Sequence, residues 1–196
     1  MALSTNETLQ LFKDTGAYLR GHFRLTSGLH SPEYLQCALV LQHPDLAARL
    51  GRALAECFED YGEIGLVAAP AIGGLIIGHE VARHFGCRFI FAERDPNAGM
   101  VFRRGFTVNP GERALVIEDV VTTGGSSREV ADTLRAAGAE VVAAGSIIDR
   151  SGGKVDLGIP RVALATLQVI TYPPDSCPLC KQGLPVVKPG SRPPGA

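Results

Sequence analysis

Short, continuously apolar stretches recur along this chain and alternate with segments of helical periodicity. Five of these stretches have strand length: 64–69, 87–92, 113–119, 140–149 and 161–167. Helical patterns at 75–85 and 126–137 lie between some of them. A strand that is buried on both faces shows no polar alternation, and such strands occur in parallel sheets covered by helices. We therefore expect an α/β fold with a parallel sheet and helices on both faces.

The length of 196 residues suits a single domain, 1–196. Within it we expect a small N-terminal hood at about 1–40 and a core sheet at about 60–170. Residues 171–196 are rich in Pro and Gly. We expect this tail to be coil that frays at its end.

The hood should begin with a helix. Ser4 and Glu7 have the spacing of a capping box, and an imperfect apolar stripe continues to about residue 20. The following segment, 21–37, is rich in Gly, Ser and Pro and is predicted to be a loop with short extended pieces. A second helix is predicted from Pro44 until it closes at Gly62.

Charge and hydropathy exclude several classes of protein. The net charge of −1 gives no global field that would attract nucleic acid or an anionic membrane. No apolar run approaches the roughly 20 residues that span a bilayer. The first ten residues, MALSTNETLQ, lack the order of a secretory signal. We expect a cytoplasmic protein with small-molecule substrates, no nucleic-acid partner and no membrane.

The third apolar stretch ends in two adjacent acids, Glu118 and Asp119, and leads into Thr122-Thr123-Gly124-Gly125 before a predicted helix. Ligands of open α/β sheets collect at the carboxyl ends of strands. A glycine-rich turn entering a helix offers unpaired backbone N–H groups to an anion. The acids precede this turn, where ribose hydroxyls could donate to them or a divalent cation could bridge them to a pyrophosphate. The pattern indicates a site for a phosphorylated ribose, and it is neither a Walker A loop nor a dinucleotide fingerprint.

The segment ALVIEDVVTTGGSS (114–127) resembles the phosphoribosyl-pyrophosphate signature of type I phosphoribosyltransferases. Within that superfamily, GHFRLTSGLHSPEYLQC (21–37) looks like the N-terminal segment of orotate phosphoribosyltransferases, and SIIDRS (146–151) is similar to their strand-end Asp-Arg. The segment 68–82 aligns with the family's pyrophosphate loop and helix. The resemblance covers most of residues 7–170.

The resemblance implies a reaction and a set of residues. The family transfers the 5-phosphoribosyl group of phosphoribosyl pyrophosphate to orotate in pyrimidine biosynthesis, with Mg²⁺ and often as a homodimer. Asp119 and Arg94 would be the catalytic residues. Phosphoribosyl pyrophosphate would contact Glu118, Asp119, Val120, Val121, Thr122, Thr123, Gly124, Gly125, Ser126, Ile72, Gly73 and Arg94. Orotate would contact Thr26, Tyr34, Thr122 and Arg150, with Arg150 pairing its carboxylate.

The chain departs from the family at several cationic positions. Many members have lysine where this chain has Thr26 and Gly73, and the segment 93–104 lacks the lysine and histidine of the family's mobile loop. Arg94 is the best remaining cation, followed by Arg103 and Arg104, which could equally be solvated hairpin charges. Arginine is too weak an acid to donate a proton, so we expect charge stabilisation rather than acid catalysis by this segment.

Two other functions remain open: a phosphoribosyltransferase for another base, and a non-catalytic sensor of phosphoribosyl pyrophosphate. Cys177 and Cys180 have C-x-x-C spacing but supply only two of four zinc ligands, and we expect an ordinary tail turn. A metal site shared across a dimer and a redox pair are the alternatives. The five histidines show no ligand spacing, and His30 could contact substrate from the base-side loop.

Overall fold

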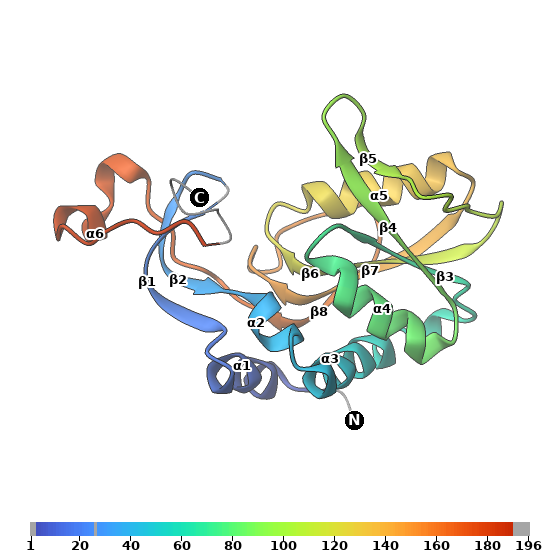
Figure 1. The fold of residues 1–196 in the computed structure, drawn as a ribbon, viewed down its shortest axis with the longest axis horizontal. Helices are drawn as coiled ribbons and strands as arrows, with labels where there is room; N and C mark the ends of the chain where they lie inside the picture. Colours follow the sequence, from blue (N-terminus) through green and yellow to red (C-terminus); the bar gives the residue numbers. More distant parts are fainter. Residues whose placement is uncertain (1–2, 26, 190–196) are drawn as a thin grey trace.

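A six-stranded sheet forms the centre of the molecule in the computed structural model, which describes residues 3–25 and 27–189 (Figure 1). The strand order is β5-β4-β3-β6-β7-β8, and every neighbouring pair is parallel except β4 and β5. The strands are β3 (Leu66–Pro70), β4 (Arg88–Asp95), β5 (Gly99–Phe102), β6 (Arg113–Val121), β7 (Glu140–Asp149) and β8 (Arg161–Thr166). The expected α/β architecture is confirmed.

Helices cover both faces of this sheet. One face carries α1 (Thr5–Asp14), α2 (Cys37–Leu41), α3 (Pro44–Glu56) and α4 (Gly74–Phe85), and the other carries α5 (Gly125–Ala136). Within the described residues, no helix combines the length and the apolar character that crossing a bilayer would require.

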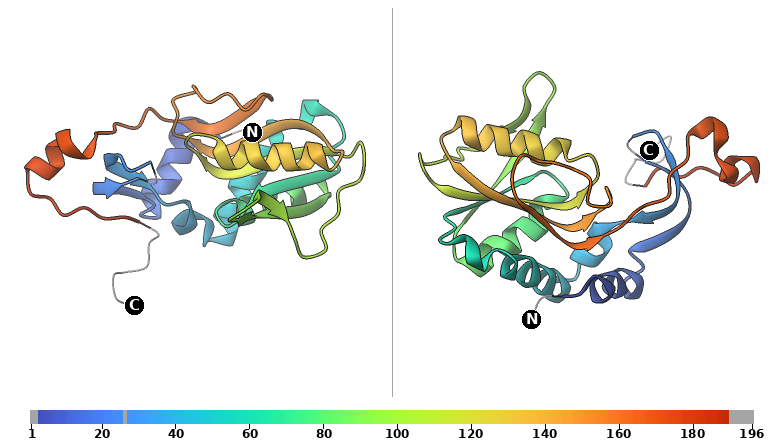
Figure 2. Two further views of the ribbon diagram at one scale, coloured as in Figure 1. Left: turned by 90° about the horizontal axis from the view of Figure 1, so that it is seen from above. Right: turned by 180° about the vertical axis from the view of Figure 1, so that it is seen from behind.

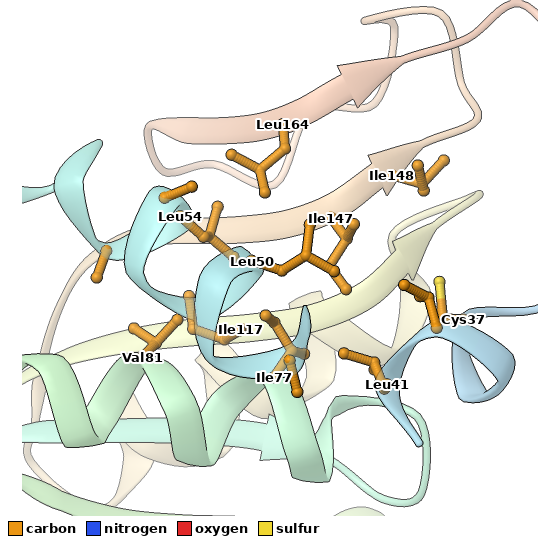
Figure 3. Packing of buried hydrophobic residues seen from close by; sticks show 14 of the residues in the cluster. Cys37, Leu41, Leu50, Leu54, Ile77, Val81, Ile117, Ile147, Ile148 and Leu164 are labelled. Atoms are coloured by element: carbon orange, nitrogen blue, oxygen red, sulfur yellow. The ribbon is translucent and has the colours of Figure 1, made fainter. Parts of the chain in front are cut away.

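The core consists of two apolar layers separated by the sheet. Neighbouring residues of β6 point to opposite faces, so Ile117 joins the layer under α3 and α4 while Val116 joins the layer under α5. In Figure 3, Leu50 of α3 and Ile77 of α4 converge with Ile117 on the first of these layers. Strands β3, β4, β6 and β7 therefore have apolar neighbours on both sides, which is why their sequences contain apolar runs.

The hood is a two-stranded antiparallel hairpin, β1 (Tyr18–Arg24) and β2 (His30–Leu35). The predicted first helix begins as expected, with the Ser4–Glu7 capping box formed, but its extension to about residue 20 is wrong. The chain leaves the helix at Gly16, which has φ of +66°, a conformation that ends a helix and favours glycine.

The helices predicted at 75–85 and 126–137 agree with α4 and α5 to within one residue, but the helix predicted from Pro44 is shorter than expected. The predicted helix from Pro44 ends at Glu56, and a short 3-10 turn, η1 (Glu59–Tyr61), follows before Gly62. The short helix α2 was not predicted, because five residues carry too little periodicity to be recognised.

The tail is not simple coil. It contains a 3-10 turn, η2 (Pro174–Ser176), and a short helix, α6 (Pro178–Lys181). Tyr172 pairs with His30 and Val187 pairs with Phe23, so the tail attaches to both strands of the hood (Figure 2). The last residues, 190–196, where we expected fraying, lie outside the described part of the chain.

Candidate functional site

A cleft of about 660 Å³ opens between the hood and the carboxyl ends of β6 and β7. Three parts of the chain that are far apart in sequence line it: the hairpin with its loop, the two strand ends, and the start of the tail. The lining residues are Leu25, Ser27, Leu29, Tyr34, Leu35, Gln36, Asp119, Val120, Thr122, Thr123, Arg150, Val169 and Thr171. The expected position of the site, at the carboxyl ends of parallel strands, is where this cleft lies.

The turn that follows β6 leaves backbone N–H groups exposed at the start of α5. Gly124 has φ of +73° and precedes α5 without any side-chain cap, and no acidic residue occupies the first turn of that helix. The first N–H groups of α5 therefore have no partner within the helix. A Cβ at Gly124 would lie 2.6 Å from atoms of both Val155 and Leu157, so only glycine fits this turn.

The acid pair lies immediately before the turn. The hydroxyl of Ser127, in α5, donates to the Glu118 carboxylate, and the backbone N–H of Val120 donates to Asp119 Oδ1 at 2.8 Å. Burial raises the pKa of Glu118 to about 7, with a smaller contribution from the neighbouring Asp119 charge. Burial also raises the pKa of Asp119. Both acids are thus costly to keep ionised until a donor or a cation joins them.

Ser127 supports the acid pair and does not face the cleft. Its side chain is buried, and its hydroxyl donates to the Glu118 carboxylate.

The turn after β3 meets the acid pair from the side. A Cβ at Gly73 would lie 2.4 Å from Asp119 Oδ1, so the two backbones approach closely and no larger residue is accommodated without a shift. Ile72, its neighbour, is 83% exposed. The sequence separation of the two segments hid this contact, although both were predicted to face the same ligand.

Arg150 is a half-buried cation that forms no ion pair with a described acid. It follows β7, and its Nε is buried without a hydrogen-bond partner. The neighbouring Asp149 pairs instead with Arg161, at 2.7 Å between Oδ2 and Nη1. Burial lowers the pKa of the Arg150 guanidinium. A buried, unpaired donor at the wall of a cleft is well placed to bind an anionic ligand group.

Tyr34 lies across from this cation. The Cζ of Arg150 is 5.8 Å from the centroid of the Tyr34 ring, which is a cation–π geometry. Burial raises the pKa of the Tyr34 hydroxyl, so the ring stays neutral at physiological pH. Together the two side chains offer a flat apolar surface and a positive charge to one ligand.

Six of the predicted site residues line the cleft: Tyr34, Asp119, Val120, Thr122, Thr123 and Arg150. Gly125 and Ser126 lie in the first turn of α5. Val121 is buried and accepts the backbone N–H of Arg150 at 2.8 Å. Thr26 lies outside the described residues.

The predicted loop cations are held in ion pairs. Arg94 lies in β4 rather than in a loop and contacts Glu129 of α5, with 2.5 Å between Nη1 and Oε2. Arg103 pairs with Asp95, and Arg104 pairs with Glu93, as expected of hairpin charges. Arg94 is not among the lining residues of the cleft, and its catalytic role stays a prediction.

Ser27 also lines the cleft, from the base-side loop, and six further lining residues were missed: Leu25, Leu29, Leu35, Gln36, Val169 and Thr171. No local pattern marks the last two, because the pairing of Tyr172 with His30 is what brings the tail beside the hairpin loop. The expectation that His30 could contact substrate is not supported, since its side chain is buried against His22, away from the cleft lining.

Comparison of the sequence with known proteins identifies a matching domain family and similar relatives. Residues 38–168 match the phosphoribosyl transferase domain. The chain is 55% identical, over 97% of its length and 99% of the relative, to a protein named orotate phosphoribosyltransferase from Pelotomaculum thermopropionicum. It is 53% identical, over 94% of its length and 96% of the relative, to one of the same name from Caldicellulosiruptor bescii.

Solved structures share the fold. A crystal structure of orotate phosphoribosyltransferase from Aeropyrum pernix superimposes with a TM-score of 0.67 at 26% identity, covering 81% of this chain and 93% of that one. An adenine phosphoribosyltransferase from Thermoanaerobacter pseudethanolicus shares the fold alone, with a TM-score of 0.57 at 18% identity over 69% of this chain and 88% of that one.

Proposed function

The chain belongs to the orotate phosphoribosyltransferase family, and we propose from this premise that it transfers the 5-phosphoribosyl group of phosphoribosyl pyrophosphate to orotate. The products are orotidine 5′-monophosphate and pyrophosphate. The reaction belongs to pyrimidine nucleotide biosynthesis. The cleft beside β6 and β7 is the proposed active site.

The observation that carries the choice of base is Arg150. Orotate bears a carboxylate, whereas adenine and guanine do not, and a half-buried guanidinium whose Nε has no partner suits a carboxylate. Tyr34 supplies the face on which the pyrimidine ring lies. A base without a carboxylate would leave the Arg150 donors unpaired in the cleft, at a cost that disfavours it.

The phosphoribosyl group occupies the other end of the cleft. Its 5′-phosphate binds the bare amides of the turn 122–126, and its ribose hydroxyls donate to Glu118 and Asp119. The pyrophosphate group lies at the turn of Ile72 and Gly73. Because Asp119 lines the cleft and also touches the Gly73 turn, it faces both sides of the bond that breaks.

The chemistry then needs little covalent help from the chain. The bond between ribose C1 and pyrophosphate loosens, positive charge develops on the ribose, and N1 of orotate forms the new bond. The side chains hold the two substrates in line, and the hood excludes water from the developing cation. Arg94 is proposed to stabilise the negative charge on the departing pyrophosphate. To do so, Arg94 must leave its ion pair with Glu129 and contact the substrate.

The acid pair fits the Mg²⁺ that the family implies. Glu118 and Asp119 are adjacent oxygen donors, and neither is ion-paired with a described cationic side chain. When bound through the pyrophosphate, Mg²⁺ supplies charge neutralisation for the leaving group. Ser127 and the Val120 amide orient the two carboxylates for that purpose.

The test is the loss of orotate absorbance with phosphoribosyl pyrophosphate and Mg²⁺, compared with adenine, guanine and uracil as acceptors. We expect turnover with orotate alone. Use of a purine in preference would favour the other-base alternative. Binding of phosphoribosyl pyrophosphate without consumption of any base would favour the sensor alternative.

Two further properties are proposed with this function. The chain acts as a homodimer, as the family resemblance implies, which light scattering of the purified protein would test. It acts in the cytoplasm, a reducing compartment that suits its free cysteines at Cys37, Cys57, Cys87, Cys177 and Cys180. Fractionation of the source cells would test the location.

A further inference from the structure

Four side chains with metal-binding atoms converge outside the cleft. His22 of β1, His30 of β2 and Cys177 before α6 are buried, and Cys180 of α6 lies at the rim of the group. Their nitrogen and sulfur atoms all lie within 4.8 Å of one another. Because the histidines show no ligand spacing in the sequence, no pattern there indicated that two of them approach Cys177 and Cys180.

The fold of the hairpin explains the two histidines. His22 lies in β1 where the register with β2 shifts, between Arg20 and Phe23, and His30 begins β2. His22 Nε2 lies 2.8 Å from His30 Nδ1, so both imidazoles project to the same side of the hairpin. The tail then places Cys177 and Cys180 over that side through the turn that starts α6.

Three of the nitrogen–sulfur separations match a tetrahedral ligand set. Zn–N bonds of about 2.0–2.1 Å and Zn–S bonds of about 2.3 Å place nitrogen and sulfur ligands about 3.6 Å apart. His22 Nε2 lies 3.5 Å from Cys177 Sγ and 3.7 Å from Cys180 Sγ, and His30 Nδ1 lies 3.4 Å from Cys180 Sγ. The two nitrogens, 2.8 Å apart, are closer than the roughly 3.3 Å of a tetrahedron, a difference that small side-chain rotations remove.

A hydrogen bond orients the His22 ring. Its Nδ1 lies 2.8 Å from the carbonyl oxygen of Leu184, and because a carbonyl only accepts, Nδ1 is the donor in this contact. The other ring nitrogen, Nε2, faces the two cysteines. A second hydrogen bond of this kind is the usual way in which proteins orient a metal-bound histidine.

Apolar contacts alone do too little to hold the tail in place against the hood. Cys177 is the only buried residue in the described part of the chain beyond Ala165, and Leu184, Val186 and Val187 are 44–51% exposed. The hood itself is a two-stranded hairpin, which is marginally stable alone. Small segments of this kind are commonly held by a structural metal.

We propose that His22, His30, Cys177 and Cys180 bind one Zn²⁺ ion, which pins the tail to the hood. Two imidazoles and two thiolates in a tetrahedron favour zinc among the biological metals. All four positions are filled by the protein, so no position remains for a substrate and the ion is structural. The role is separate from Mg²⁺ at the acid pair.

The test is the metal content of the full chain purified under reducing conditions. We expect about one zinc ion per chain in the wild type, and its loss in Cys180→Ser and Cys177→Ser. Cys57→Ser is the matched control, because Cys57 is half-buried and outside the cluster, and it should retain the ion. Equal loss in Cys57→Ser would place the metal elsewhere.

A second measurement uses only the wild-type protein, so it does not depend on whether the variants fold. Wild-type protein stripped by a chelator is titrated with Co²⁺, which we expect to give the visible absorption of a tetrahedral thiolate complex at one equivalent per chain. Absence of both zinc and this spectrum would overturn the proposal. A hydrogen-bonded His22–His30 pair or a Cys177–Cys180 disulfide would give that result, and bound iron in place of zinc would overturn the choice of metal.

Discussion

Replacing Arg150 with methionine should make the protein more stable and a poorer orotate enzyme. The unliganded chain buries the Nε donor of Arg150 without a partner, and no described acid pairs with the guanidinium. Methionine keeps much of the length and apolar contact of the side chain while removing its charge and donors. The substitution should therefore raise the free energy of unfolding and lower the activity with orotate.

The change in stability depends on the side chain in the free protein, and the change in activity depends on its contact with bound orotate. A buried donor without a partner costs about 1–3 kcal/mol, so its removal should raise the free energy of unfolding by about 1 kcal/mol or more. For a chain of this length that corresponds to a rise in Tm of about 2–4 °C. A hydrogen bond to a charged group contributes about 1.5–3 kcal/mol, so kcat/KM for orotate should fall about 10- to 150-fold.

The assay combines calorimetry with steady-state kinetics for both substrates. The loss should appear mainly as a higher KM for orotate, with the KM for phosphoribosyl pyrophosphate nearly unchanged, because Arg150 lies at the base end of the cleft. The preference for orotate over uracil, which lacks the carboxylate, should shrink by a similar factor. Arg135→Met is the control, since Arg135 is an exposed residue of α5 paired with Asp132.

Unchanged orotate kinetics in Arg150→Met would refute the assignment of the base end. A lower Tm together with an unchanged orotate-to-uracil preference would show that Arg150 is needed for folding and does not read the carboxylate.

Three further predictions concern the rest of the site. Gly73→Ala should raise the KM for phosphoribosyl pyrophosphate, because its Cβ would lie 2.4 Å from Asp119 Oδ1; an unchanged KM in steady-state assays would contradict this contact. The pKa of Glu118 is raised to about 7 in the folded chain, so stability is fully present below its ordinary value of 4.5 and declines as pH rises toward 7. Denaturant titrations should show a loss on the order of 3 kcal/mol over that range at most, and Glu118→Gln should flatten the profile. Chelation of the zinc at His22 and Cys177 should lower Tm and raise the orotate KM, because the hairpin loop and the tail both line the cleft; Mg²⁺ alone should not restore this KM, whereas Zn²⁺ with Mg²⁺ should.

The positions of the central strands in the sequence were predictable because each of these strands is buried on both faces. Residues 113–119 and 140–149 are apolar runs with no polar alternation, and they became β6 and β7. The end of α1 was not predicted, since apolar residues continue past Gly16 and only its left-handed backbone stops the helix. The periodicity of a sequence shows which side chains are apolar, but it gives no information on the backbone angle φ.

The lining of the cleft was predictable where one segment of the sequence carries several polar side chains. Asp119, Thr122 and Arg150 follow directly from strand ends, and the cleft contains them. Thr171 could not be predicted, because the tail reaches the cleft only through its pairing with β2. The same long-range pairing hid the approach of Cys177 to His22, which are 155 residues apart.

The most direct test of the account is the structure of the chain bound to orotidine 5′-monophosphate. We predict the phosphate on the backbone amides of 122–126, the ribose hydroxyls on Glu118 and Asp119, and the carboxylate on Arg150. A nucleotide bound elsewhere, or one bound in this cleft with its carboxylate turned away from Arg150, would contradict it.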